Sequence, residues 1–159
     1  MTRKEFSQYL QPLTEKLYSF AHSLIPDDLQ AEQLVIDSVN AYLIKEKKNI
    51  LARKAELTNK KSMQHVRRII LKSVLRYMAD IGCRRAHQLH NMKMVNASEF
   101  QAFYNLEPEA RMVLKLRYEA QFTVEEVEEI MQLARYQVIE KIHNGRFLIV
   151  TDLNKGVTV

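Results

Sequence analysis

The sequence predicts an all-α protein made of two small helical domains, an N-terminal helical bundle and a C-terminal helix-turn-helix domain. The chain has three glycines and three prolines in 159 residues, which leaves little room for hairpins or for glycine-rich phosphate loops. Apolar residues recur at steps of three and four over most of its length, as they do in amphipathic helices. With 47% hydrophobic residues, the chain has enough apolar material for a packed core.

The helical periodicity also predicts the domain boundaries. A chain of this length fits one globular unit or two small helical domains joined by a short linker. The periodicity fades after residue 85 and returns near residue 105. We therefore expect a helical domain over residues 1–88, a linker over 89–104 and a helix-turn-helix domain over 105–159.

Two helices are predicted in the first 44 residues. The first carries an apolar stripe from Phe6 to Leu24, and Pro12 divides it into an entry turn and a main helix, because an interior proline costs about 3 kcal/mol. The second, over about 29–44, is apolar most of the way round, so it is either central in its domain or shared with a partner. Its two stripes are Ala31, Leu34, Val35, Ser38 and Tyr42, and Leu29, Ile36, Val39 and Leu43.

A third helix is predicted over about 62–85, after a polar loop over 45–61. Its charge is notable: residues 45–95 carry 14 Lys and Arg against three Asp and Glu, whereas the segments on both sides are net acidic. Arg68, Lys72 and Arg76 recur every fourth residue on one side of this helix, and Arg84 and Arg85 follow at its end. This basic stripe is either a surface for a polyanion or an ordinary solvated face. Its expected core residues are Val66, Ile69, Ile70, Ser73, Val74, Tyr77 and Ile81.

The C-terminal unit has the features of a helix-turn-helix. Pro108 suits the first turn of its opening helix. Thr123 and Glu126 form a capping box, and Phe122 and Val127 stand at the two positions of a hydrophobic staple. Two short helices with a turn near 133–135 then follow, and a plain helical hairpin is the alternative. The expected buried residues are Val127, Ile130 and Met131 in the first helix and Val138, Ile139, Ile142 and Phe147 in the second.

Other kinds of chemistry find little support in the sequence. Cys83, His87 and His90 share a helix face, but a structural zinc ion needs four ligands and no fourth stands nearby, so no metal or cofactor is predicted. No catalytic set of serine, histidine and acid and no HExxH motif occurs, so we expect neither an enzyme nor a small-molecule substrate. A single cysteine, with no apolar run near 20 residues, favours a cytoplasmic protein without membrane insertion.

With these motifs in view, the chain resembles the extracytoplasmic-function sigma factors of bacteria. The segment "IPDDLQAEQLVIDSVNAYL" is similar to the family's "D-A-E-D-L-V-Q-E-V-F" helix. The segments "LEPEARMVLKLRY" and "FTVEEVEEIMQLARYQVIEKIHNGR" resemble its C-terminal domain. The two similarities occur in the family's order, about 70 residues apart, so the resemblance covers both predicted domains.

The resemblance implies partners and site residues. The helix over 29–44 would bind the clamp helices of core RNA polymerase, and the basic helix and the last helix would contact promoter DNA; an anti-sigma factor is a possible further partner. The polymerase-binding residues would be Glu32, Val35, Ile36, Asp37, Val39 and Asn40. The DNA-binding residues would be Arg68, Lys72, Arg76, Arg84, Arg85, Arg135, Gln137, Lys141 and Arg146.

Several positions depart from the family pattern. Ile36 replaces a glutamine, and "MQHV", with Met63 and His65, replaces an aromatic pair that would stack on unpaired bases. Gln132 replaces the turn glycine, and Glu140 in the last helix would face phosphates. Two functions therefore stay open: a divergent sigma factor that directs promoter-specific transcription initiation, or a sigma-like protein that binds an anti-sigma factor or RNA polymerase without reading promoter DNA.

Overall fold

The computed structural model describes residues 4, 8, 10–46, 60–89 and 100–155. These residues form seven α-helices and one 3-10 turn, and no strand lies among them, which confirms the all-α class. The elements are η1 (Gln11–Leu13), α2 (Thr14–Leu24), α3 (Asp28–Lys45), α5 (Lys60–Leu89), α6 (Gln101–Tyr104), α7 (Pro108–Tyr118), α8 (Val124–Met131) and α9 (Arg135–Lys155).

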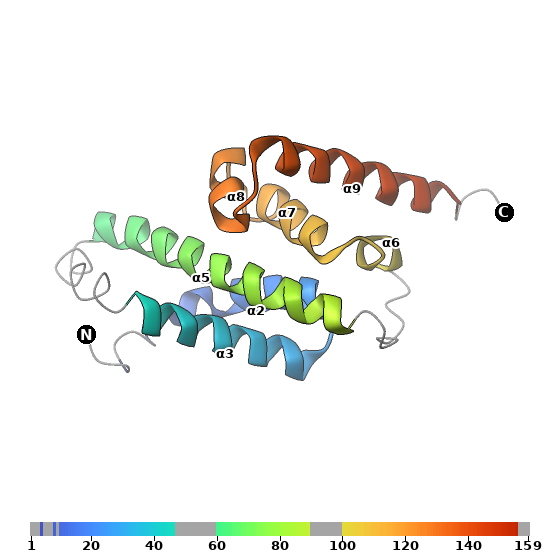
Figure 1. Ribbon diagram of the computed structural model, residues 1–159. Helices are drawn as coiled ribbons and strands as arrows, with labels where there is room; N and C mark the ends of the chain where they lie inside the picture. The colour runs from blue at the N-terminus through green and yellow to red at the C-terminus, as the bar shows by residue number, and fades with distance from the viewer. Residues whose placement is uncertain (1–3, 5–7, 9, 47–59, 90–99, 156–159) are drawn as a thin grey trace.

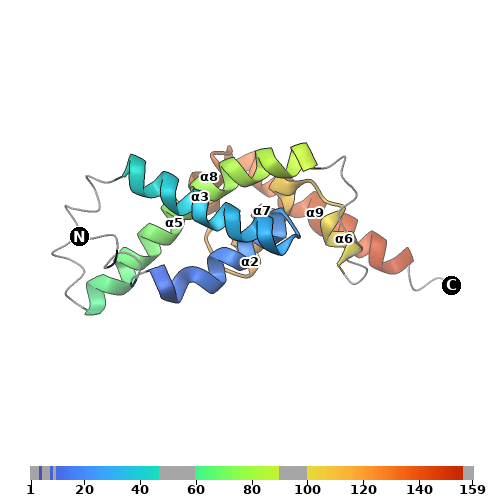
Figure 2. The ribbon, with the colours of Figure 1, turned by 90° about the horizontal axis from the view of Figure 1, so that it is seen from below.

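The N-terminal half forms a layer of three long helices (Figures 1 and 2). As expected, Pro12 lies in the 3-10 turn that precedes α2, and Asp27 caps α3 by accepting a hydrogen bond from the backbone of Gln30 at 2.9 Å. The predicted first stripe of α3 is buried at Ala31, Leu34, Ser38 and Tyr42. Of the second stripe, Val39 and Leu43 are half-buried against the core, whereas Leu29 and Ile36 are exposed.

Helix α5 of this layer also contacts the C-terminal half. It packs against α3 on one side and against α8 on the other. Gly82 allows α5 to lie close to α2 and α3, because a Cβ atom built there would lie 2.6 Å from Leu24 Cδ1 and 2.9 Å from Leu34 Cδ2. The helix continues to Leu89, slightly beyond the predicted domain end at 88, and the short helix α6 lies within the expected linker.

The C-terminal half forms the second layer, with α7 and α8 against the first layer and α9 running along the outside (Figure 1). The predicted capping box is present: Thr123 accepts from the backbone of Glu126, and Glu126 accepts from the backbone of Thr123. The two staple residues, Phe122 and Val127, are both buried. Gln132, where the resemblance places a turn glycine, ends α8 in the left-handed conformation at φ 54°.

The larger of two hydrophobic clusters joins the two layers. One cluster of buried side chains includes Leu17 and Val74 of the first layer together with Met112, Val127 and Val138 of the second. The expected division into two domains is therefore not visible as two separate cores. In the part of the chain that the structure describes, no helix is both long enough and apolar enough to cross a bilayer.

One prediction about the core was wrong. Ile139 and Phe147 are exposed, whereas the inward face of α9 carries Val138, Gly145 and the half-buried Ile142. At 3.6 residues per turn, Ile139 and Phe147 lie far round the helix from this face. Gly145 has no side chain, so the inward stripe lacks an apolar residue at one of its own positions.

Candidate nucleic-acid and partner interfaces

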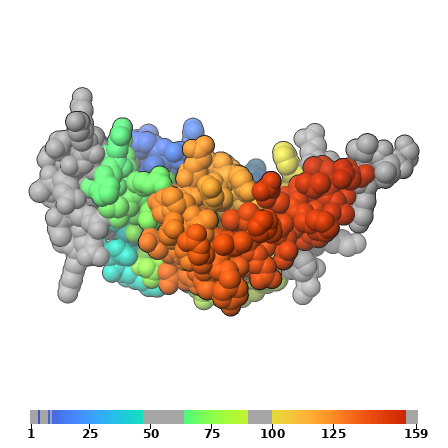
Figure 3. All heavy atoms as spheres, turned by 90° about the horizontal axis from the view of Figure 1, so that it is seen from above, coloured from blue at the N-terminus to red at the C-terminus, as the bar shows by residue number. Residues whose placement is uncertain are grey.

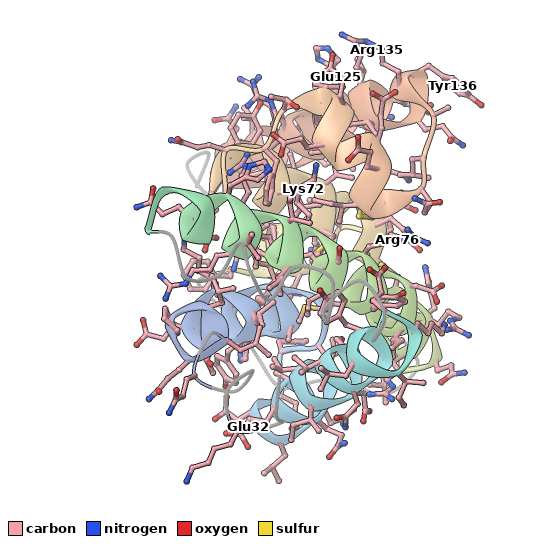
Figure 4. All side chains as sticks on the ribbon, turned by 90° about the vertical axis from the view of Figure 1, so that its left-hand side faces the viewer. Glu32, Lys72, Arg76, Glu125, Arg135 and Tyr136 are labelled. Atoms are coloured by element: carbon pink, nitrogen blue, oxygen red, sulfur yellow. The ribbon has the colours of Figure 1, made fainter. Side chains whose placement is uncertain are left out.

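The basic stripe of α5 faces the acidic helix α8. Arg68 Nη2 donates to both carboxylate oxygens of Glu126, at 2.9 and 3.0 Å. Lys72 Nζ donates to Glu129 at 2.8 Å and lies 3.6 Å from Glu126. Figure 4 shows Lys72 between α5 and the C-terminal layer. Two of the three predicted phosphate-binding cations are therefore paired within the chain.

Glu126 combines two roles at this interface. Its carboxylate accepts from the Thr123 backbone in the capping box and also receives Arg68. Burial raises the pKa of this carboxyl, but the hydrogen bonds from Arg68 and Thr123 and the charges of Arg68 and Lys72 outweigh it, so the pKa lies below its usual value. The N-terminus of α8 is thus tied electrostatically to α5.

The other predicted cations of α5 have different surroundings. Arg76 is exposed, with its guanidinium 6.0 Å from the centre of the Tyr77 ring. Arg84 pairs with Asp80 one turn earlier at 3.0 Å. Arg85 reaches α3 and donates to Asp37 at 2.6 Å, which joins a predicted DNA-binding residue to a predicted polymerase-binding residue.

The pair between Asp37 and Arg85 is partly shielded from solvent. Burial raises the pKa of Asp37, but hydrogen bonds from Arg85 and Gln33 lower it below its usual value. Asp37 is therefore charged at neutral pH and holds α3 against α5.

The predicted DNA-binding residues of α9 all have contacts within the chain. Arg135 pairs with Glu125 at 3.1 Å, and Lys141 pairs with Glu107. Gln137 Oε1 accepts from the Ala134 backbone at 2.9 Å and so caps the start of the helix. Arg146 donates to the Tyr118 hydroxyl at 3.2 Å. These four side chains are placed along more than one side of α9, and the structure does not gather them into one basic patch.

The predicted polymerase-binding residues divide between the surface and the core of α3. Glu32 and Ile36 are exposed, and Figure 4 shows Glu32 on the side of the molecule opposite α9. Val35, Val39 and Asn40 are half-buried, and Asp37 is paired with Arg85. Leu29 and Ile44 extend the exposed apolar surface at the two ends of the helix, with 78% and 79% of their areas accessible.

Arg111 is a structural residue that the periodicity of α7 does not identify. It is 7% exposed and makes four hydrogen bonds, all to backbone carbonyls. Two acceptors, Ser23 and Leu24, end α2; Tyr104 ends α6, and Leu106 follows it. Burial lowers the pKa of the guanidinium, but arginine stays charged, and the carbonyl dipoles at a helix C-terminus favour a cation. The only sequence signal is a charged residue between the apolar residues Ala110 and Met112.

A groove of about 850 Å³ lies where α2, α6, α7 and α9 meet. Its lining residues include the aromatic side chains of Tyr18, Phe103, Tyr104 and Tyr118. Sequence periodicity gives no sign of this groove, because its walls combine α6, α7 and α9 with α2, which lies far earlier in the chain.

The three residues considered for zinc do not form a described site. Cys83 is buried, and burial and the charge of Glu109 raise the pKa of its thiol to about 12. His87 binds Glu109 at 2.7 Å, and His90 lies outside the described residues. Within the described ranges, no group of three or more metal-binding side chains comes together.

No protein-family model matches the chain, and no curated protein matches it in sequence. The functional interpretation therefore depends on the surfaces described above and on the motifs in the sequence.

Proposed function

We propose that the chain is a divergent sigma factor that binds core RNA polymerase in the cytoplasm and directs promoter-specific transcription initiation. The observation that carries this proposal is the outward face of α3. Leu29 and Ile36 are exposed there beside Glu32, on the helix whose sequence resembles the clamp-binding helix of sigma factors. Because the opposite face of α3 already fills the core, this exposed face is available to a partner helix.

The proposal assigns promoter contact to the basic side of α5. Arg68 and Lys72 now bind Glu126 and Glu129 of α8. The side chain of Arg68 is 48% exposed, and ion pairs at a protein surface contribute about 0–1 kcal/mol each, so phosphates can compete with these carboxylates for the cations.

A reconstitution with core polymerase tests the proposal. The chain is added to the core enzyme, and binding and promoter-dependent transcripts are measured with genomic promoter fragments. Ile36→Asp is expected to weaken core binding at least tenfold, whereas Leu148→Asp, which changes an exposed leucine of α9, leaves binding unchanged. The absence of core binding contradicts the proposal, and so does an equal effect of the two substitutions.

A second candidate function is supported by a different observation. Eight of the nine predicted DNA-binding residues are engaged in hydrogen bonds or ion pairs within the chain, and the outward face of α9 includes the apolar residues Ile139 and Phe147. Such a surface suits a sigma-like protein that binds an anti-sigma factor or RNA polymerase without reading promoter DNA. Core binding without any promoter-dependent transcript selects this function.

Salt dependence separates the two candidates independently of transcription. If Arg68 contacts phosphate, Arg68→Ala reduces the slope of log affinity against log salt by about one, equally for all DNA sequences. Lys16→Ala is the matched control, because Lys16 is an exposed cation of α2 outside the basic stripe. An unchanged slope for Arg68→Ala contradicts DNA binding by α5.

A further inference from the structure

The outward side of α9 carries a continuous apolar stripe. Tyr136, Ile139, His143, Phe147 and Val150 follow one another at steps of three, four, four and three residues. At 3.6 residues per turn, they lie within about 80° of arc, on a side of the helix different from that of the buried Val138. Tyr136 and Phe147 are each 70% exposed, Val150 is 56% exposed and Ile139 is 38% exposed.

The position of α9 leaves this stripe uncovered by the described helices. In Figure 3, α9 lies open along the upper face of the molecule. In Figure 4, Tyr136 points away from the other helices. A helix that reads bases in the major groove needs hydrogen-bonding groups on its outward side, and these four apolar residues lack the amide and charged groups that read base edges. The stripe is better suited to another apolar surface than to DNA.

The spacing of the stripe residues along the chain is symmetric about His143. The steps read the same in both directions, so an antiparallel copy of α9 places Tyr136 opposite Val150 and Ile139 opposite Phe147, with His143 opposite itself. Each aromatic side chain then meets a smaller, β-branched one, which keeps the separation of the two helices even. A two-fold interface requires this self-complementarity, in which residue i contacts j and j contacts i.

We propose that the chain forms a homodimer in which two α9 helices pair antiparallel through this stripe, with the two-fold axis at His143. The inference is independent of the proposed transcription function. The dimer covers the outward face of α9, so dimer formation and entry of this helix into a DNA groove exclude each other.

The available area fits a weak, reversible dimer. A fully covered aromatic side chain buries about 150–250 Å², so the exposed parts of Tyr136 and Phe147 provide roughly 200–350 Å² per copy. With Ile139, His143 and Val150, and with the stems of flanking side chains, two copies bury on the order of 1,000 Å², the lower limit for a specific interface. The stripe extends over about 21 Å of helix, or roughly four turns.

Sedimentation of the full chain tests the dimer itself. We expect a monomer–dimer equilibrium with a dissociation constant of roughly 1–100 µM. Phe147→Asp is expected to weaken the dimer at least tenfold, whereas Leu148→Asp, on the opposite side of α9, leaves it unchanged. Circular dichroism checks that both variants stay folded. A chain that is monomeric at several hundred micromolar overturns the proposal, whatever other molecule covers the stripe, and so does a dimer that is insensitive to Phe147→Asp.

Cysteine cross-linking tests the antiparallel register. With diamide as the oxidant, which accepts the two electrons and two protons released as a disulfide forms, His143→Cys is expected to give a covalent dimer. Tyr136→Cys and Val150→Cys are expected to cross-link to each other when mixed, and not each to itself. The native Cys83 is buried with a pKa of about 12, so the unmodified chain serves as the unreactive control. Self-linking of Tyr136→Cys would indicate a parallel pair and overturn the assignment.

Discussion

Arg68 and Glu126, 58 residues apart, are joined by two hydrogen bonds of 2.9 and 3.0 Å between the middle of the chain and the start of α8. The same guanidinium lies 4.7 Å from the centre of the Phe122 ring. Arg68 therefore contacts both the capping box and the hydrophobic staple that fix the start of α8. The most basic helix of the chain and its most acidic helix hold each other in place.

Removal of the Glu126 charge is expected to strengthen polyanion binding. Glu126→Gln removes the ion pair of Arg68 and one of the two ion pairs of Lys72. The affinity for double-stranded DNA at low salt should therefore rise severalfold. Glu15→Gln removes one negative charge from the exposed side of α2 and serves as the control, with little change expected. Fluorescence anisotropy with labelled DNA measures both variants. Equal gains would mean that only net charge matters and would contradict a specific masking of Arg68.

Acid is expected to loosen the contacts of α5 with α8 and with α3. The pKa values of Glu126 and Asp37 are lowered in the folded protein, so their stabilisation is fully present above the unfolded pKa values of about 4 and is lost as the pH falls through the lower folded values. Thermal unfolding between pH 7 and pH 3 measures this loss. Glu126→Gln should show a weaker dependence on pH than the native chain, and an identical dependence would contradict this role of Glu126.

Replacement of Arg111 is expected to be strongly destabilising. Arg111→Met leaves three buried carbonyls and one partly buried carbonyl without this donor, which should lower the free energy of unfolding by about 3 kcal/mol. Arg117→Met on the same helix removes a cation with one long hydrogen bond, of 3.4 Å to Phe122, and should cost less than 1 kcal/mol. Urea unfolding compares the two variants. Similar losses would show that the four carbonyls of the Arg111 site are not what stabilises the fold.

Two glycine substitutions are expected to differ in their effects. Alanine favours a helix interior by about 1 kcal/mol, and overpacking a core costs about 1–3 kcal/mol. In Gly82→Ala, the new methyl group meets two fully buried leucines, Leu24 and Leu34, so a net loss of about 1 kcal/mol is expected. In Gly145→Ala, it meets Leu114 alone below 3.0 Å, and the net effect should be near zero. The reverse order in chemical unfolding would contradict the packing at Gly82.

Local patterns in the sequence predicted much of the fold. The capping box at Thr123, the staple of Phe122 and Val127, and the first stripe of α3 involve residues within one or two turns of each other, so their spacing alone determines them. The buried face of α9 was harder to predict. Gly145 occupies one position of that face without a side chain, and Phe147 was assigned to the buried face instead.

The pairing of distant surfaces was not predictable in the same way. The basic stripe of α5 and the acidic residues of α8 are both evident in the sequence, but periodicity defines the faces of a helix and not which faces meet. The opposite charges of the two helices were the available signal. The role of Arg111 was harder to predict from the sequence, because its hydrogen-bond acceptors are backbone carbonyls, which every residue has.

The backbone acceptors of Arg111 affect which substitutions this protein tolerates at the junction of its two layers. The guanidinium binds main-chain oxygens of residues 23, 24, 104 and 106, so its hydrogen bonds do not depend on the side chains of those residues. The Tyr104 ring, whose centre lies 5.6 Å from the guanidinium, adds a side-chain contact at one of the four positions. Substitutions at these four positions keep the acceptors in place as long as the backbone keeps its course. One arginine can therefore preserve the junction of the two layers while the residues around it diverge.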